Sequence, residues 1–369
     1  MKKVVRIVMW FVILILVIAG ISLSALYMLA DPNKMKPVIA DEVFKRTGYK
    51  LVIDGNLSWS LYPQVGLKAA HVTLTAPGQK RAFLDMKGMH VAVELSQLLH
   101  GINKLSGEVH ITDVTMLNVR ANSALVGLHW QDNILTLRPI QASLYNGSMS
   151  GMARGKDFST TPAWNWDVTL SHVDIKPLLR DANGDHSRLK VSGTGQVRIN
   201  ASTQGSVTQE MISNLNGVTD FNITNGIVEG VDLNYLLITA DALLNRKAIE
   251  LPQNINQTAF DSLAGSMLIT NGLAQTNNLL LISSTFKVKG QGNYNLPRKS
   301  LDLALLLESQ KELMTQWQIP VLISGEVSKP DVRLDMREIN KQIASEQIDK
   351  VKEKVKNKIK DIANNLLGE

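Results

Sequence analysis

Residues 300–308 read SLDLALLLE, and the spacing of the leucines in this stretch decides the fold class. Leucine occupies every second position from 301 to 307: Leu301, Leu303, Leu305 and Leu307. Successive side chains of a β-strand point to opposite faces, so this spacing predicts a strand with one continuous apolar face. We therefore predict a chain that is mainly β.

The same period of two recurs through most of the chain. Apolar side chains alternate at Leu51 and Ile53, at Leu57 and Trp59, at Val72 and Leu74, at Val91 and Val93, at Val109 and Ile111, at Trp164, Trp166, Val168 and Leu170, and at Val197 and Ile199. Gly, Asn and Asp separate these runs and favour turns, as DG at 54–55, NG at 146–147, 225–226 and 271–272, and GQGN at 290–293. About 16 to 20 short strands in sequence order predict an antiparallel meander.

A short motif repeats within this β-rich region. FNITNGIVEGVDL at 221–233 and MLITNGLAQTNNLLL at 267–281 share an I-T-N-G turn followed by an apolar strand. Repeated hairpin units of this kind favour an elongated curved sheet over a compact double sandwich.

Helices are expected at only a few places between the chain ends. Residues 33–46 are predicted to form a helix that Gly48 ends, because glycine readily adopts the left-handed conformation after a helix. DLNYLLITADALLN at 232–245 is a second predicted helix. Pro177 is expected to open a single helical turn.

The N-terminal segment is predicted to cross a membrane. Residues 7–30 carry no charge, and a helix of that length is about 36 Å long, enough for the hydrocarbon core. Lys2, Lys3 and Arg6 precede it, so the positive-inside rule places the short N-terminus in the cytoplasm. An uncleaved anchor is favoured over a cleavable signal peptide, because the apolar stretch continues past the small residues Ser22 and Ser24.

The C-terminal segment is predicted to form a basic amphipathic helix over residues 338–369. Its apolar positions recur every three or four residues: Ile348, Val351, Val355, Ile359, Ile362 and Leu366. Lysines, including Lys352 and Lys356, cover much of the remaining surface. Such a helix can lie on an anionic membrane, pair with a partner protein, or pack its apolar stripe back on its own domain.

Composition excludes several classes of protein. The 369 residues contain no cysteine, which excludes disulfide scaffolds, iron–sulfur clusters and thiol catalysis. The net charge of +6 suggests nucleic-acid binding, but residues 1–30 carry +3 and residues 341–369 carry +2 of it. A nucleic-acid binder needs its positive charge on the folded body, so we expect no nucleic-acid partner.

The sequence carries no motif for catalysis or for a metal. The seven histidines lack metal-ligand spacing. GSMSG at 147–151 has methionine at the place of a nucleophilic serine, and GQGNYN at 290–295 has asparagine in place of the third glycine of a dinucleotide-binding loop. We therefore expect a protein that is not an enzyme and has no cofactor and no metal.

Several segments resemble the AsmA family of bacterial envelope proteins. DPNKMKPVIADEVFKRTGYKLVIDGNLSWSLYPQVGLKAAHVTLTAPG at 31–78 carries the resemblance at the start of the chain. LRPIQASLYNGSMSGMARG at 137–155 extends it through the middle, and FNITNGIVEGVDL, residues 286–308 and residues 319–335 extend it toward the end. These segments follow one another in the order typical of the family.

The resemblance implies an inner-membrane anchor with the bulk of the chain in the periplasm. The family is similar to chorein-type bridge lipid transfer proteins, in which a curved sheet forms a trough that holds phospholipid acyl chains. This implies lipid transport between the inner and outer membranes, with membrane phospholipids as partners. The alternative is an assembly or scaffold factor for outer-membrane proteins, which would bind precursors at exposed strand edges.

These expectations define regions of the chain and a groove. The regions are the anchor at 1–30, a chorein-like helix at 31–48, an N-terminal β-trough at 49–205, an AsmA-like C-terminal β region at 206–337, and the basic helix at 338–369. The helix is a candidate contact for an outer-membrane or periplasmic partner. The predicted groove residues are Leu57, Trp59, Leu67, Leu74, Val91, Val93, Val109, Ile111, Leu301, Leu303, Leu305 and Leu307. Strands spaced about 4.8 Å apart give a trough of roughly 80–95 Å at most.

Overall fold

The computed structural model describes residues 31–60, 65–75, 79–93, 104–158, 160–184, 187–245, 255–310 and 318–366. The predicted anchor at residues 7–30 lies outside these ranges. Within the ranges, no helix combines the length and the apolar character that crossing a membrane requires.

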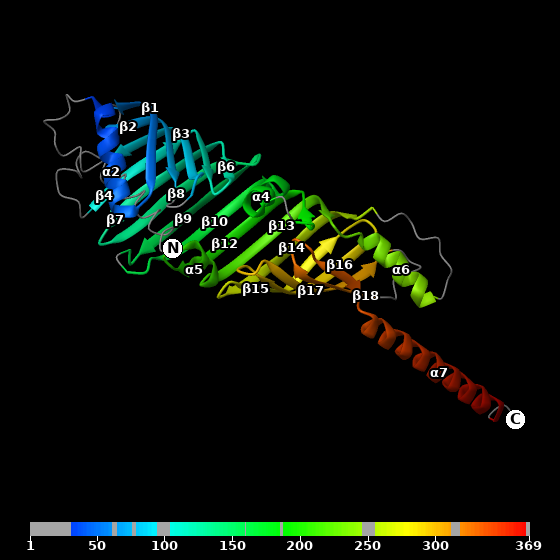
Figure 1. Cartoon of the computed structure of the whole chain (residues 1–369). Coiled ribbons are helices and arrows are strands. Elements are labelled where there is room, and N and C mark those ends of the chain that lie inside the picture. The colour runs from blue at the N-terminus through cyan, green and yellow to red at the C-terminus, as the bar shows by residue number, and fades with distance from the viewer. Residues whose placement is uncertain are drawn as a thin grey trace.

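The described chain is mainly β, with all its strands in one large open antiparallel sheet of 19 strands. The sheet is elongated and twisted, with a few helices along it (Figure 1). The strands are β1 (Lys50–Ser60), β2 (Val65–Thr75), β3 (Ala82–Val93), β4 (Lys104–Ile111), β5 (Asp113–Met116), β6 (Val119–Ala121), β7 (Ser123–Gln131), β8 (Ile134–Leu144), β9 (Gly147–Lys156), β10 (Ala163–Asp174), β11 (Lys190–Val191), β12 (Thr194–Gln204), β13 (Asn216–Glu229), β14 (Gln257–Thr270), β15 (Leu273–Ile282), β16 (Phe286–Asn295), β17 (Ser300–Ser309), β18 (Gln318–Glu326) and β19 (Asp331–Leu334).

Strands pair nearly in sequence order, as the alternation and turn signals predicted. β1, β2 and β3 pair in succession, β3 continues to β4, and β4 pairs with β7. The β5–β6 hairpin lies beside β3, and the short β11 pairs with β13 alongside β12. From β7 to β10 and from β12 to β19 each strand pairs with the next, and β10 pairs with β12.

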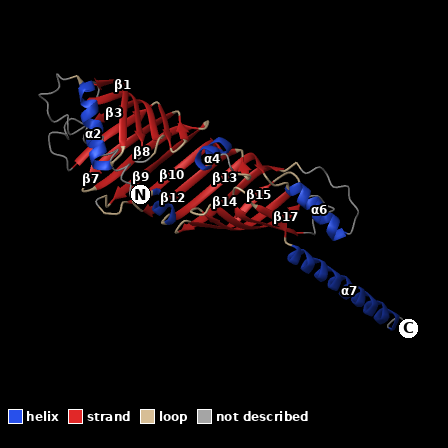
Figure 2. Cartoon of the chain, viewed as in Figure 1, coloured by secondary structure: helices blue, strands red, loops and turns tan. Residues whose placement is uncertain are grey.

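The helices lie at separate places along this sheet and do not form a layer of their own (Figure 2). They are the 3₁₀ turn η2 (Pro32–Met35), α2 (Lys36–Thr47), α4 (Ile175–Asn183), α5 (Thr208–Ser213), α6 (Leu233–Asn245) and α7 (Met336–Leu366). The predicted helices at 33–46 and 232–245 are confirmed as α2 and α6, and Gly48 ends α2 with a φ of 73°. The single turn expected at Pro177 was wrong, because α4 starts two residues earlier and runs for nine residues. The six-residue α5 was not predicted.

Some of the predicted turns are hairpins, and others are not. Asn271 and Gly272 connect β14 to β15 with φ angles of 49° and 75°, which is a two-residue hairpin turn. Gly55 (φ 72°) instead lies inside β1, where the pairing register with β2 shifts, and Asn225 (φ 52°) lies inside β13. Residues 290–293 likewise lie inside β16. A left-handed residue is compatible with an irregularity within a strand as well as with a turn, so the two I-T-N-G motifs do not form the same structure.

Two hydrophobic clusters lie along the sheet. The first involves α2 and the strands from β1 to β10, with Ile39, Leu57 and Trp164 among its most buried members. The second joins α6 to the strands from β13 to β18, and Leu307 within it is fully buried. The predicted region boundary at 205–206 falls in the connection between β12 and α5, while hydrogen bonding of the sheet continues from β12 to β13.

Candidate functional site

One face of the sheet is apolar along its whole row of strands, and we call it the apolar face. Residues directly opposite each other in an antiparallel pair share a face, so the registers trace this face from strand to strand. At the first end Leu67 pairs with Trp59 and Val91, and Val91 pairs with Val109. At the far end one such row is Val288, Leu307 and Ile319 on β16, β17 and β18.

All twelve residues predicted to line a groove occupy register positions of the apolar face. Their burial differs, however. The side chains that are at least nine-tenths buried are Leu57, Leu67, Leu74, Val91, Val109, Ile111, Leu305 and Leu307. Trp59, Leu301 and Leu303 are partly exposed. Val93 pairs with Val65 and Gly107, which places it on the same face as Val91, two residues earlier on β3.

One accessible part of the apolar face lies between the two clusters. Its partly exposed side chains belong to neither cluster, and we call them the exposed middle: Met149, Val168, Leu170, Val197 and Ile199. They come from β9, β10 and β12, where Leu170 pairs with both Met149 and Val197, and Val168 pairs with Ile199. The groove prediction did not include these residues, although the alternation on β10 and β12 was the signal that could have found them.

Strand β9 contributes little bulk to the apolar face beside this region. Its positions on the face are Gly147, Met149, Gly151, Ala153 and Gly155. A Cβ at position 151 would lie 2.3 Å from the backbone oxygen of Asp167, so glycine is required for the close approach of β9 to β10. Apart from Met149, the side chains of β9 on the apolar face are therefore small, and those of the neighbouring β10 are larger.

An aromatic cluster borders the exposed middle on the side of the first hydrophobic cluster. Trp164 stacks on Trp166 with ring centroids 5.3 Å apart, and Phe158 packs edge-on against Trp164 at 5.7 Å. Trp130 stacks on Phe158 at 5.7 Å. Indole rings combine a large apolar surface with one polar N–H group, and the buried Nε1 of Trp164 has no protein hydrogen-bond acceptor.

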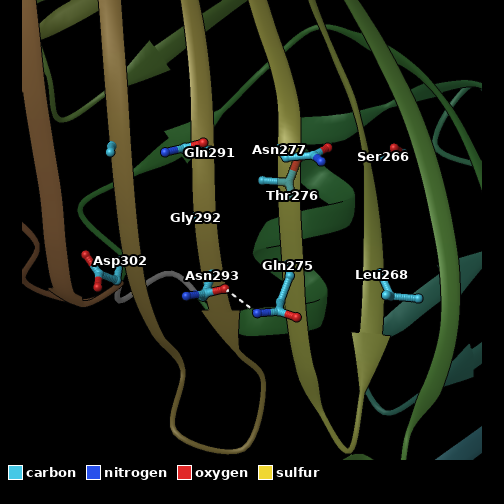
Figure 3. Close-up of a pocket in the computed structure, with 10 residues that line it drawn as sticks. Ser266, Leu268, Gln275, Thr276, Asn277, Gln291, Gly292, Asn293 and Asp302 are labelled. Atoms are coloured by element: carbon cyan, nitrogen blue, oxygen red, sulfur yellow. Dashed lines mark hydrogen bonds between the residues drawn. The ribbon is translucent and has the colours of Figure 1, made fainter.

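The opposite face of the sheet is polar. On β14 to β17 it forms an open hollow of about 540 Å³ lined mostly by amide and hydroxyl side chains (Figure 3). Gln275 on β15 donates a hydrogen bond to Asn293 on the adjacent strand β16 at 3.1 Å. Farther along this face, burial lowers the pKa of His90, and the nearby Lys68 and His110 act in the same direction. This face carries amide, hydroxyl and charged side chains, with exposed apolar side chains at Met152, Val218 and Leu268 among them.

Histidine and carboxylate side chains do not gather into a metal-binding cluster among the described residues. No group of three or more His, Asp or Glu side chains among them could hold a metal ion. The close carboxylate–histidine contacts, such as His71 with Asp85 at 3.0 Å, lie on the polar face between paired strands.

The C-terminal helix α7 leaves the sheet after β19 and extends away from it (Figure 1). Ile348, Val351 and Val355 on this helix are exposed by 54%, 60% and 51%. The alternative in which this stripe packs back on its own domain is contradicted for these three residues.

Comparison with known proteins gives matches over much of the chain. A sequence model of the AsmA family matches residues 1–107 and 103–279. The protein named Protein AsmA of Escherichia coli (strain K12) is 34% identical over 88 residues. This similarity covers 24% of the present chain and only 14% of that relative's length. No solved structure matches the chain.

Proposed function

The chain belongs to the AsmA family, and we propose that it is a non-enzymatic protein of the bacterial envelope that holds phospholipid acyl chains on its apolar face. Residues 7–30 would anchor it in the inner membrane, with the bulk of the chain in the periplasm. Its role would be to support phospholipid transport between the inner and outer membranes.

The exposed middle is the observation that carries this proposal. Helices and packed side chains cover the apolar face toward both ends of the sheet. Between them, Val168, Leu170 and Ile199 remain partly exposed, so apolar surface there faces water. Apolar surface of this kind on a soluble domain marks a place where an apolar ligand binds. The polar and charged groups of the opposite face would keep that side of the sheet hydrated.

The exposed middle is large enough to contact a good part of an acyl chain. Its three strands β9, β10 and β12, at a spacing of about 4.8 Å, span roughly 10 Å across the sheet. One acyl chain fills half of the bilayer's hydrocarbon core, which is about 15 Å. Each methylene group that moves from water onto the face would contribute about 0.8 kcal/mol.

The alternative of an assembly factor depends on free strand edges, and the first of these edges is partly occupied. Asn33 bonds to both the N–H and the carbonyl of Leu57 on β1, at 2.9 and 3.1 Å, and Lys36 donates to the carbonyl of Gly55. At the other edge β19 has only four residues. A precursor strand would find β1 partly occupied and only four residues at β19, so the accessible face supports lipid binding better.

Ile199→Asp tests the proposal, with Asn200→Asp as its matched control. The two positions are adjacent on β12, Ile199 on the apolar face and Asn200 exposed on the polar face. We expect the full-length Ile199→Asp protein, purified in mild detergent, to retain less than about one fifth of the wild-type phospholipid in mass spectrometry. Asn200→Asp should retain the wild-type amount, because the same carboxylate is then in water.

Crosslinking gives a direct readout of the same contact. Photo-activatable amino acids at 199 and at 200 should give lipid adducts at 199 and few at 200. Equal crosslinking at both positions, or a folded Ile199→Asp protein with its normal complement of lipid, would disprove acyl-chain binding at the exposed middle.

A further inference from the structure

Helix α7 is attached to the sheet only through its first turns. Asp335 caps it, because its carboxylate accepts a hydrogen bond from the backbone N–H of Arg337 at 3.1 Å. Ile339 is 1% exposed, and Gln342 donates a hydrogen bond to the backbone oxygen of Gln318 at 2.8 Å. Beyond Gln342, every side chain from Ile348 to Asn357 whose burial is described is exposed.

The apolar stripe of α7 faces away from this attachment. A helix turns by about 100° per residue, so Ile348, Val351 and Val355 lie about 180°, 120° and 160° around the axis from Ile339. Helix positions 359, 362 and 366 continue the stripe over about 27 Å of helix length from Ile348. Because the buried Ile339 fixes the rotation of the helix, the stripe cannot turn onto the sheet unless the packing of Ile339 is broken.

Charge is arranged around the stripe in a definite pattern. Residues 348–366 contain six lysines and three acids, a net charge of +3. Positions 352, 354, 356 and 358, all lysine, lie within about 100° of the stripe's centre. The acids Asp349, Glu353 and Asp361 all lie at least about 120° from that centre. The helix thus has an apolar stripe flanked by four lysines, while the three acids and the other two lysines, Lys350 and Lys360, lie behind it.

We propose that the α7 stripe docks on an anionic lipid surface. A helix with this distribution lies in the plane of the headgroups, its apolar residues at the acyl boundary and its lysines beside lipid phosphates. Since α7 follows β19, this surface lies at the end of the sheet opposite to β1, the first described strand. The inference does not depend on lipid binding at the exposed middle, because it concerns a different element.

Vesicle binding by the full-length chain tests this proposal. The protein is placed in phosphatidylcholine nanodiscs and mixed with one of two kinds of vesicle. One kind contains phosphatidylcholine alone, and the other contains phosphatidylcholine with a mole fraction of about 0.3 of the anionic lipid phosphatidylglycerol. We expect co-flotation with the anionic vesicles, at least fivefold less with the neutral ones, and a strong reduction at high salt, because the lysine contribution is screened.

Two neighbouring substitutions separate the stripe from general charge effects. Val355→Asp and Asn357→Asp add the same carboxylate two residues apart, at exposed positions about 160° from each other around the helix axis. Val355→Asp should lower co-flotation at least fivefold, whereas Asn357→Asp should change it less than twofold. Thermal unfolding of the sheet should be unchanged in both, because neither side chain is packed.

A fluorescent label identifies what covers the stripe. The chain has no cysteine, so Val351→Cys and Asn357→Cys each accept a single environment-sensitive dye. Anionic vesicles should shift the emission of the dye at 351 to the blue and leave the dye at 357 unchanged. Co-flotation of Val355→Asp at the wild-type level, or an unshifted dye at 351, would overturn the proposal and leave a protein as the partner of the stripe.

Discussion

Asn33 connects the start of the described chain to the free edge of the sheet. Its side-chain oxygen accepts from the N–H of Leu57 and its amide nitrogen donates to the Leu57 carbonyl. Leu57 pairs with Ala69 of β2, yet both its backbone polar groups are directed to Asn33, so they belong to the open side of β1. One asparagine therefore replaces the missing neighbour strand at this point and blocks further pairing.

Replacing Asn33 should loosen this edge in a graded way. Asn33→Ala removes both hydrogen bonds to Leu57, and we expect a loss of about 1–2 kcal/mol in the free energy of unfolding. Asn33→Asp keeps an acceptor for the N–H but places an oxygen where the amide nitrogen donates to Asp31, Asn56 and the Leu57 carbonyl, so its effect should be at least as large as that of alanine. Hydrogen exchange of peptides from β1 measures the effect directly. If exchange in β1 is the same in all three proteins, Asn33 does not protect the edge.

Backbone conformation was predictable at single residues, but its consequence was not. Asn225, Gly55 and Asn271 all have positive φ angles, as their residue types indicated. Whether such a residue reverses the chain or only makes a strand irregular depends on the pairing of the flanking residues with distant strands. Sequence around Asn225 holds no information about β14, so the turn predicted there was wrong, while the one at Asn271 was right.

The elements themselves follow closely from the period of apolar residues. Alternation predicted the strands and the single apolar face, because register preserves the face from one strand to the next. The six-residue helix α5 was missed, since a helical period cannot be recognised over fewer than two turns. The predicted groove residues all lie on the apolar face, but identifying the exposed middle needed the positions of α2 and α6, which no local pattern specifies.

Adjacent residues of α2 give a direct test of how this helix covers the sheet. Ile39 is 1% exposed within the first cluster, whereas Val38 is 61% exposed. Ile39→Ala should reduce the free energy of unfolding by about 2–5 kcal/mol, because it leaves a cavity between α2 and the sheet. Val38→Ala should change it by less than about 0.5 kcal/mol. Chemical denaturation of the two purified variants measures both values, and similar losses would show that α2 does not rest on the sheet through Ile39.

The length of the whole molecule differs from the sequence-based expectation for a topological reason. Sixteen of the strands follow one another in the row, because the β5–β6 hairpin and β11 lie beside it rather than extending it. Their spacing gives a sheet of about 72 Å, which is less than the 80–95 Å expected when every strand counts. Helix α7 adds up to about 46 Å, so the sheet and the helix together determine how far one chain reaches from its β1 end.

Distances between spin labels test this arrangement, and the absence of cysteine makes the labelling specific. Lys68, Arg154 and Asp302 are exposed on the polar faces of β2, β9 and β17. Twelve strand spacings separate β2 from β17 in the row, so labels at 68 and 302 should lie about 50–60 Å apart once twist shortens the path. Seven spacings separate β9 from β17, so labels at 154 and 302 should lie about 30–35 Å apart. A single extended row requires the first distance to exceed the second by nearly the ratio of the spacings. In a sheet folded on itself into two layers the two distances would be similar. Similar distances in double electron–electron resonance would therefore exclude one continuous apolar face from end to end.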